Sequence, residues 1–222
     1  TEEDFFKKQI LTYMGNKRKY LNKIDEIITL VKKELEQSNI KIGEGFSGSG
    51  IVSRLFKNRC GDFFYVNDIS GYSKTLNECY LTSTQNLSTD DIETLIQHIK
   101  EMRSFIENSE NPKPFIAKNW APKDDDNIQA NERVYFTSEN GKIIDQMLYY
   151  IHNNVEDEYK SFLLAPLIVQ CSMHNNTNGQ FSAYYKDENK EKGMYGGKKQ
   201  VDLNRITGKI TPEMPILTSH KA

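Results

Sequence analysis

The stretch IKIGEGFSGSGIVSRLF, residues 40–56, decides the fold of this chain. Its first residues, Ile40–Glu44, are a short strand candidate, and the glycine-rich run Gly45–Gly50 follows directly. Apolar residues at helical spacing then predict a helix that begins at Ile51. The aromatic and β-branched run FFYV, residues 63–66, predicts a second buried strand. Strand, glycine turn, helix and strand form a βαβ unit, which predicts an α/β fold with a parallel sheet.

Helical periodicity occurs on both sides of this unit. Residues 21–35 and residues 92–106 each carry apolar side chains at helical spacing along one face. Ser88 and Asp91 have the spacing of a capping box, with Asp in the place of the usual Glu or Gln. We therefore expect one helix before the βαβ unit and another that begins just after Ser88.

The second half of the sequence predicts further helices and one strand. Residues 108–134 are rich in Asn, Asp, Pro and Lys and predict an irregular loop. Helices are expected over about 138–152 and 156–173, and Pro166 should kink the second helix or mark its start. Residues 181–185, FSAYY, are a strand candidate.

Composition limits the class of protein. The 222 residues, 37% of them hydrophobic, suffice for one α/β core with an attached subdomain. Cys60, Cys79 and Cys171 show no paired spacing and suit a reducing cytosol. The sequence has no long apolar run, so we expect a cytoplasmic protein with no membrane partner. The four histidines lack ligand spacing, and we predict no metal site.

Charge is distributed unevenly between the expected domains, which we place at residues 1–87 and 88–222. The balance is +2 over residues 1–87, −7 over 88–160 and +3 over 161–222. A surface that faces nucleic acid should therefore use the two ends of the chain. The alternative is that these charges form ordinary solvated faces.

The glycine run and Asp68 together predict a ligand site. Glycines such as Gly48 and Gly50 at a strand-to-helix turn let the backbone approach a ligand closely. Asp68 ends the second strand, 18 residues after Gly50, where its carboxylate can accept both ribose hydroxyls of an adenosine. Dinucleotide sites use a similar arrangement, with the carboxylate about 20 residues on. The alternative is a tight turn with a capping Asp.

A second group of residues lies upstream, in the segment YMGNKRKYL, residues 13–21. Tyr13, Gly15 and Lys17 precede the first expected helix, whose exposed amides and the Lys17 charge suit an anion. A solvated basic helix start is the alternative reading.

Taken together, YMGNK at residues 13–17, FSGSG at 46–50 and Asn67-Asp68 resemble the amino-terminal motifs of Dam-like (D12 class) adenine-N6 DNA methyltransferases. The resemblance implies a partial Rossmann-like methyltransferase sheet over residues 1–87. It also implies a mostly helical DNA-recognition subdomain over 88–222, which returns toward the catalytic core. The implied cofactor is S-adenosylmethionine. Tyr13 and Lys17 would contact its methionine end, and Asp68 its ribose. The full implied cofactor set is Tyr13, Gly15, Lys17, Phe46, Gly48, Gly50 and Asp68.

The segment NTNGQF, residues 176–181, resembles the family's Asn-x-x-Gly-x-Phe segment of the DNA-recognition region. Basic side chains are expected on phosphates, and the amides on base edges, although turn-forming asparagines are an equal alternative. Tyr184 and Tyr185 are interpreted as strand packing, with base stacking as the alternative. The expected contacts to double-stranded DNA are Arg18, Lys19, Asn176, Asn178, Gln180, Lys186, Lys198, Lys199 and Arg205.

The family's catalytic motif, Asp-Pro-Pro-Tyr, does not occur in the sequence. The nearest strings, NPKPF at residues 111–115 and NWAP at 119–122, precede the segment that the motif should follow. We therefore assign no catalytic residue and expect the catalytic strand to be missing from this chain. The chain should bind cofactor and DNA but not methylate by itself.

Three interpretations follow. The first is the amino-terminal part of an adenine-N6 DNA methyltransferase, with the rest elsewhere or on a second chain, and with or without a nuclease in a restriction–modification pair. The second is a catalytically inactive subunit that binds S-adenosylmethionine and DNA. The third, a nicotinamide-dependent Rossmann enzyme, leaves residues 13–17 unexplained.

Overall fold

The structure of the chain is a computed structural model that describes residues 10–11, 17–59, 64–110, 112–178 and 181–219. Contacts divide the chain into two compact units, each of which is described by itself. Unit 1 comprises Thr1–Thr94 with Pro215–Ala222, and unit 2 comprises Leu95–Met214. The unit boundary after Thr94 lies within a helix, beyond the expected domain boundary at residue 87.

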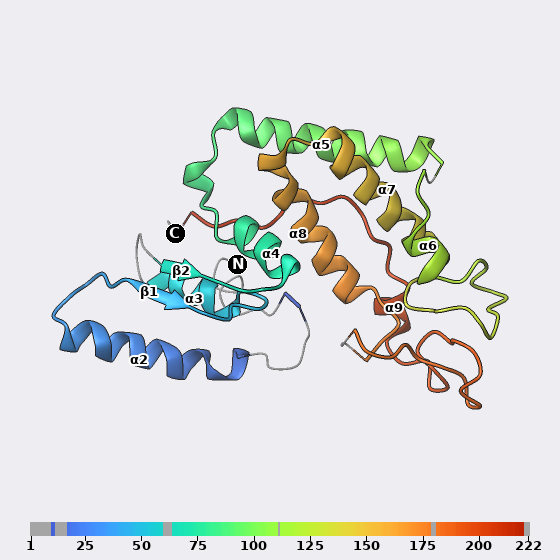
Figure 1. Cartoon of the computed structure of the whole chain (residues 1–222), viewed down its shortest axis with the longest axis horizontal. Helices are drawn as coiled ribbons and strands as arrows, with labels where there is room; N and C mark the ends of the chain where they lie inside the picture. Colours follow the sequence, from blue (N-terminus) through green and yellow to red (C-terminus); the bar gives the residue numbers. More distant parts are fainter. Residues whose placement is uncertain (1–9, 12–16, 60–63, 111, 179–180, 220–222) are drawn as a thin grey trace. The chain divides into compact units, whose positions relative to one another are not determined.

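Unit 1 contains the predicted βαβ unit (Figure 1). Strand β1 (Ile42–Glu44) and strand β2 (Phe64–Val66) pair in parallel, and helix α3 (Ile51–Arg59) connects them. The register sets Ile42 beside Phe64 and Glu44 beside Val66. Because the strands are parallel, their carboxyl ends meet at the same edge, where the segments after Glu44 and Val66 begin.

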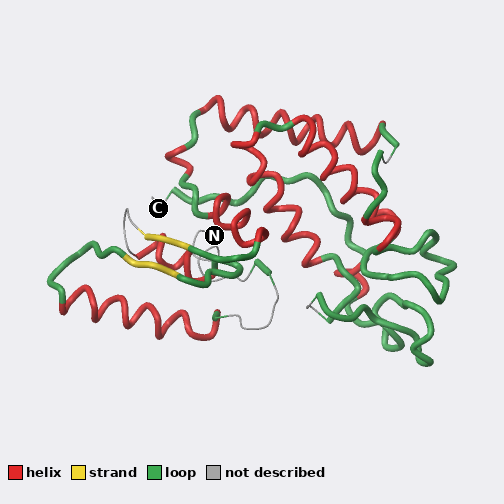
Figure 2. The backbone as a smooth tube through the Cα atoms, viewed as in Figure 1, coloured by secondary structure: helices red, strands yellow, loops and turns green. Residues whose placement is uncertain are grey.

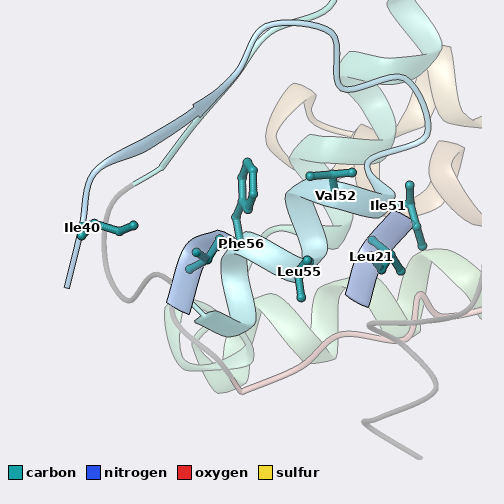
Figure 3. Close-up of a cluster of buried hydrophobic side chains, with 7 residues drawn as sticks. Leu21, Ile40, Ile51, Val52, Leu55 and Phe56 are labelled. Atoms are coloured by element: carbon teal, nitrogen blue, oxygen red, sulfur yellow. The ribbon is translucent and has the colours of Figure 1, made fainter. Parts of the chain in front are cut away.

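One apolar cluster holds α3 against the strands and the preceding helix α2 (Leu21–Glu34) (Figure 3). Each buried aliphatic or aromatic side chain in such a cluster contributes about 1.5–3 kcal/mol relative to exposure. Ile24, Ile42 and Phe64 pack against the cluster while remaining half-buried. Its buried members are Leu21, Ile28, Ile40, Ile51, Val52, Leu55 and Phe56.

Two short 3₁₀ turns and a further helix complete the described part of unit 1. They are η1 (Arg18–Tyr20), α4 (Gly71–Tyr80) and η2 (Thr84–Asn86). The carboxyl-terminal segment of the unit lies beside η2, because the Thr84 amide donates to the Thr218 carbonyl at 3.0 Å and the Ser83 hydroxyl to the Ser219 carbonyl at 3.1 Å. The sequence analysis did not predict α4.

The capping box at the start of helix α5 (Thr89–Asn108) is confirmed. The Ser88 amide donates to Asp91 Oδ2 at 2.7 Å, and the Asp91 amide donates back to Ser88 Oγ at 3.1 Å. Asp therefore serves in the position usually held by Glu or Gln, and two amides at the helix start are satisfied.

The regular secondary structure described in unit 2 consists of helices joined by long loops (Figure 2). The two expected helices are present as α7 (Ser138–Asn154) and α8 (Asp157–Met173), and two short helices, α6 (Ile116–Asn119) and α9 (Leu203–Ile206), were not expected. Pro166 lies inside α8 and so does not mark its start. Helix α6 interrupts the region predicted as a loop, because the buried Asp145 carboxylate accepts hydrogen bonds from the Ile116 and Ala117 amides.

The strand expected at residues 181–185 is wrong. Tyr184 makes a single antiparallel bridge with Thr177, and Lys186 makes another with Gly193, so the segment is an irregular hairpin. The backbone contacts of the segment are isolated: the Tyr185 amide donates to the Asn176 carbonyl at 2.9 Å, and the Met194 amide donates to the Tyr185 carbonyl at 3.0 Å.

The described residues therefore form a mixed α/β protein whose sheet has two strands. The α/β class is confirmed, and the Rossmann-like form of the sheet stays a prediction. In this part of the chain, no helix is both long and apolar enough to cross a membrane.

Candidate functional site

The glycine loop connects β1 to α3 at the carboxyl edge of the sheet. Gly48 and Gly50 have φ of +54° and +72°, in the left-handed region that glycine adopts without steric cost. A Cβ built on Gly50 would lie 2.6 Å from Asn77 Oδ1. The backbone conformation therefore requires glycine at both of these positions, which were predicted to line a ligand.

Asp68 fastens this loop to the end of β2. Its Oδ2 accepts a hydrogen bond of 2.8 Å from the Gly48 amide, and its Oδ1 accepts one of 2.9 Å from the Ser70 amide. These hydrogen bonds, from Ser70 first and then Gly48, lower the pKa of Asp68, which stays ionised. The Ser70 hydroxyl and the Ile69 amide add smaller contributions of the same sign.

Helix α4 supports the loop from the other side with polar residues. The Asn77 amide donates to Ser47 Oγ at 2.8 Å, and Ser73 Oγ lies 3.3 Å from Ser47 Oγ. Ser73 Oγ also donates to the Gly48 carbonyl. Ser47, Ser73 and Asn77 are all buried, so the loop is held by a polar network with little exposure to water.

Glu44, at the end of β1, belongs to the same site and was missed by the sequence analysis. Ser53 Oγ donates to Glu44 Oε2 at 2.5 Å. Burial raises the pKa of Glu44 to about 7, while the Ser53 hydrogen bond and the charge of Lys17 oppose the rise. The nearby negative charge of Asp68 adds to it. The sequence feature that could have identified Glu44 is its position as the last residue of the strand before the glycine loop.

Lys17 is the one residue of the segment 13–17 that the structure describes, and its positive charge acts to lower the pKa of Glu44 at the strand edge. Lys17 is exposed and precedes η1, and its carbonyl accepts a hydrogen bond of 2.8 Å from the Tyr20 amide. The other two residues of that motif, Tyr13 and Gly15, lie outside the described residues.

Two apolar side chains at this edge face solvent. Phe46, in the glycine loop, is 84% exposed, and Ile69, which follows Asp68, is fully exposed. A hollow of about 500 Å³ also lies beside the loop, with Ser47, Asp68 and Asn77 among its lining residues. The edge therefore offers apolar faces, hydrogen-bond acceptors and amide groups to one ligand.

The expected DNA contacts are divided between the units. Arg18 and Lys19 are exposed on η1 of unit 1, where Lys19 Nζ lies 4.9 Å from the centre of the Tyr20 ring. In unit 2, the exposed Asn178 and Lys186 line one hollow of about 360 Å³. Gln180 lies outside the described residues.

Asn176 has a structural role, which changes the expectation that it reads a base. Its side chain is fully buried, and its amide donates to the Val134 and Met194 carbonyls at 2.9 and 3.3 Å. Its Oδ1 accepts a hydrogen bond of 3.0 Å from the Gly196 amide. Because both amide hydrogens are used inside unit 2, we leave Asn176 out of the DNA-contacting set.

Arg205 is likewise occupied within unit 2. Its guanidinium donates to the carbonyls of Met173, Asn175 and Thr177 at 2.6–3.0 Å, where it satisfies the end of α8 and the segment after it. We therefore leave Arg205 out as well.

The two other lysines predicted to contact DNA are exposed. Lys198 forms an ion pair of 2.7 Å with Glu188, in which both side chains are more than 60% exposed, and Lys199 is also exposed. Such surface pairs contribute about 0–1 kcal/mol and break readily for another anion. Among the described residues, no group of three His, Cys, Asp or Glu side chains is placed to hold a metal ion.

A parallel βαβ unit with a glycine loop and a carboxylate at the end of the next strand is the arrangement with which open α/β proteins bind ligands at strand ends. The family model for D12 class N6 adenine-specific DNA methyltransferases matches residues 13–207. The chain belongs to this family.

Two relatives show the same relationship. The chain is 28% identical over 188 residues to "Modification methylase LlaI" of Lactococcus lactis subsp. lactis, covering 79% of this chain and 27% of that protein. It is 26% identical over 182 residues to "Type II methyltransferase M.NlaIII" of Neisseria lactamica, covering 80% of this chain and 50% of that protein. The chain thus spans half or less of the length of these relatives. No solved structure matches the chain.

Proposed function

We propose that this chain binds S-adenosylmethionine and double-stranded DNA as part of an adenine-N6 DNA methyltransferase of the restriction–modification type. The observation that carries the proposal is the hydrogen bond between the Gly48 amide and Asp68, which builds the ligand edge in a chain of this family. The names of the two relatives support a modification methylase in particular.

The residues present fit the proposed cofactor. The Glu44 carboxylate and the Lys17 ammonium carry the two charges opposite to those of an amino-acid end group. We propose that Glu44 binds the α-ammonium and Lys17 the α-carboxylate. Asp68 accepts hydrogen bonds from the ribose hydroxyls, and the exposed Phe46 and Ile69 cover flat ring surface. When bound, the cofactor supplies an electrophilic methyl group on sulfur.

In this proposal the chain orients the cofactor and holds DNA, and the acceptors for the adenine amine come from elsewhere. A poor nucleophile such as that amine needs placed hydrogen-bond acceptors, which in the family are supplied by Asp-Pro-Pro-Tyr. No such motif is present in these 222 residues. We propose that it is supplied by a longer polypeptide or by a second chain.

The second candidate is a subunit that binds both ligands without methylating. The two candidates differ in one assay. A fragment or chain that carries an Asp-Pro-Pro-Tyr strand restores methyl transfer to DNA under the first proposal and has no effect under the second. Incorporation of labelled methyl groups into adenine measures the difference.

Calorimetric titration of the 222-residue chain with S-adenosylmethionine, and separately with NAD, tests the cofactor. We expect saturable binding of S-adenosylmethionine and none of NAD. Binding of NAD alone would support the nicotinamide alternative and reject the proposal. Binding of neither would show that the edge built by Gly48 and Asp68 does not suffice for a cofactor site.

A further inference from the structure

Ser53 is a buried serine in the first turn of α3, and its hydroxyl makes its hydrogen bond outside that helix. A serine in a helix can donate to the carbonyl of the preceding turn, but Ser53 Oγ donates to Glu44 Oε2 at 2.5 Å. Ser53 has no exposed surface, so its hydroxyl needs a partner inside the protein. The first turn of α3 is thereby tied to the last residue of β1.

The residues around Ser53 in α3 pack by apolar contact. Ile51, Val52 and Leu55 all belong to the buried apolar cluster of unit 1. An alanine between them would satisfy burial and helix propensity at least as well as serine does. Packing therefore does not account for the hydroxyl, and its acceptor, Glu44, does.

The start of α3 has no side-chain cap from its own chain neighbour. Gly50, which precedes the first residue of α3, has no side chain that could accept from the amides of the first turn. The Glu44 carboxylate takes this place, because the Ser53 backbone amide also contributes a hydrogen bond to it. Two donors of one residue, the hydroxyl and the amide, therefore hold the Glu44 carboxylate in one orientation.

The same donors act on the ionisation of Glu44. Burial raises the pKa of Glu44 to about 7, and the Ser53 hydroxyl is the largest of the contributions that oppose this rise. The positive charge of Lys17 and the Ser53 amide also lower the pKa, whereas the negative charge of Asp68 raises it. A hydrogen bond donated to a carboxylate favours its charged form, so without the hydroxyl Glu44 should stay protonated to a higher pH.

We propose that Ser53 is a positioning residue for cofactor binding, which orients the Glu44 carboxylate toward the α-ammonium of S-adenosylmethionine. This inference rests on the proposed function, in which Glu44 binds that ammonium. Ser53 does not touch the cofactor, because it is fully buried and acts through Glu44. Since an ammonium needs the ionised carboxylate, the same hydroxyl prepares Glu44 for the ligand near neutral pH.

Calorimetry of the 222-residue chain in buffers of different ionisation enthalpy measures both the affinity for S-adenosylmethionine and the protons released on binding. At pH 7 the unmodified chain should release about half a proton, because a carboxyl group with a pKa of about 7 is half ionised there. Ser53→Ala should release about one proton and bind about tenfold more weakly. Ser53→Thr retains the hydroxyl and should restore both quantities.

Three controls separate this role from a structural one. The ligand 5′-methylthioadenosine lacks the amino-acid end, so the unmodified chain and Ser53→Ala should bind it equally and release no proton. Ser53→Ala added to Glu44→Gln should cause no further loss of affinity, because the hydroxyl acts through the carboxylate. Ser38→Ala, at an exposed position between α2 and β1, should behave like the unmodified chain.

Weaker binding of both ligands by Ser53→Ala, with unchanged proton release, would show that Ser53 only supports the fold and would overturn the proposal. Equal affinity and equal proton release in Ser53→Ala and the unmodified chain would also overturn it, and would leave the cofactor site itself intact. Absence of S-adenosylmethionine binding by the unmodified chain would contradict the proposed function and this inference together.

Discussion

The Asp68 carboxylate accepts a 2.8 Å hydrogen bond from the backbone amide of Gly48, so the residue at the end of β2 fixes the loop that follows β1. The glycine loop and Asp68 are thereby joined at one edge of the sheet. Its geometry has consequences for affinity, stability and pH dependence that can be measured on the 222-residue chain.

Replacing Asp68 should weaken the binding of S-adenosylmethionine. Asp68→Ala removes both the loop contact and the proposed ribose acceptor, and we expect a loss of about 1–3 kcal/mol by calorimetry. Glu26→Gln, on the exposed surface of α2, is the control and should bind normally. Unchanged affinity in Asp68→Ala would remove Asp68 from the cofactor site.

Gly50→Ala should destabilise the chain, whereas Gly45→Ala should not. Gly50 has φ of +72°, and an added Cβ would lie 2.6 Å from Asn77 Oδ1, while a Cβ at Gly45 meets nothing within 4 Å. We expect the free energy of unfolding in urea to fall by about 1–3 kcal/mol for Gly50→Ala. Equal stability of the two variants would argue against this loop conformation.

Glu44 should make both stability and cofactor affinity depend on pH. Its pKa is raised from 4.5 to about 7, so the folded state binds a proton more tightly than the unfolded state. The free energy of unfolding should therefore decline as pH rises from 4.5 to about 7. Glu44→Gln should make that decline smaller. The measurement is the urea midpoint as a function of pH.

The proposed contact of Glu44 with the cofactor ammonium predicts that binding has the opposite pH dependence to stability. A cation favours the ionised carboxylate, so affinity for S-adenosylmethionine should increase with pH up to about 7, with release of a proton on binding. Calorimetry in buffers of different ionisation enthalpy counts that proton. No proton release at a pH below 7 would place the ammonium elsewhere.

The two asparagines of the recognition segment should behave differently. Asn176→Ala leaves the carbonyl of the buried Val134 without its side-chain donor and the buried Gly196 amide without its acceptor, and we expect about 1–3 kcal/mol loss of stability. Asn178 is exposed, so Asn178→Ala should leave the unfolding midpoint unchanged and lower DNA affinity. If thermal unfolding showed that Asn178→Ala lowers the midpoint, and DNA titration showed that Asn176→Ala lowers only DNA affinity, the two proposed roles would be exchanged.

The elements that the sequence predicts well are those whose signal is local. The βαβ unit follows from apolar periodicity on either side of a glycine run, and the Ser88–Asp91 cap follows from spacing alone. Helix α4 was missed because its inner face carries the polar Ser73 and Asn77, which removes the apolar period.

The errors concern contacts between residues distant in sequence. Residues 181–185 have a strand-like composition, but the segment makes only a single bridge, between Tyr184 and Thr177, and the Tyr185 amide donates to the Asn176 carbonyl. Glu44 was missed because its contacts, the Ser53 hydroxyl and the charge of Lys17, come from segments that the sequence does not place beside it. The positions of the glycine loop and Asp68 at the strand ends were therefore predictable, whereas the division of the asparagines into buried and exposed was not.

The most direct test of the cofactor site is a titration of ¹⁵N-labelled chain with S-adenosylmethionine, followed through the backbone amide resonances of Gly48 and Gly50. The account predicts that both resonances shift and saturate together with the calorimetric binding curve, and that NAD at the same concentration leaves them unchanged. Saturable binding that leaves both glycine resonances in place would contradict it, because the ligand would then occupy another part of the chain.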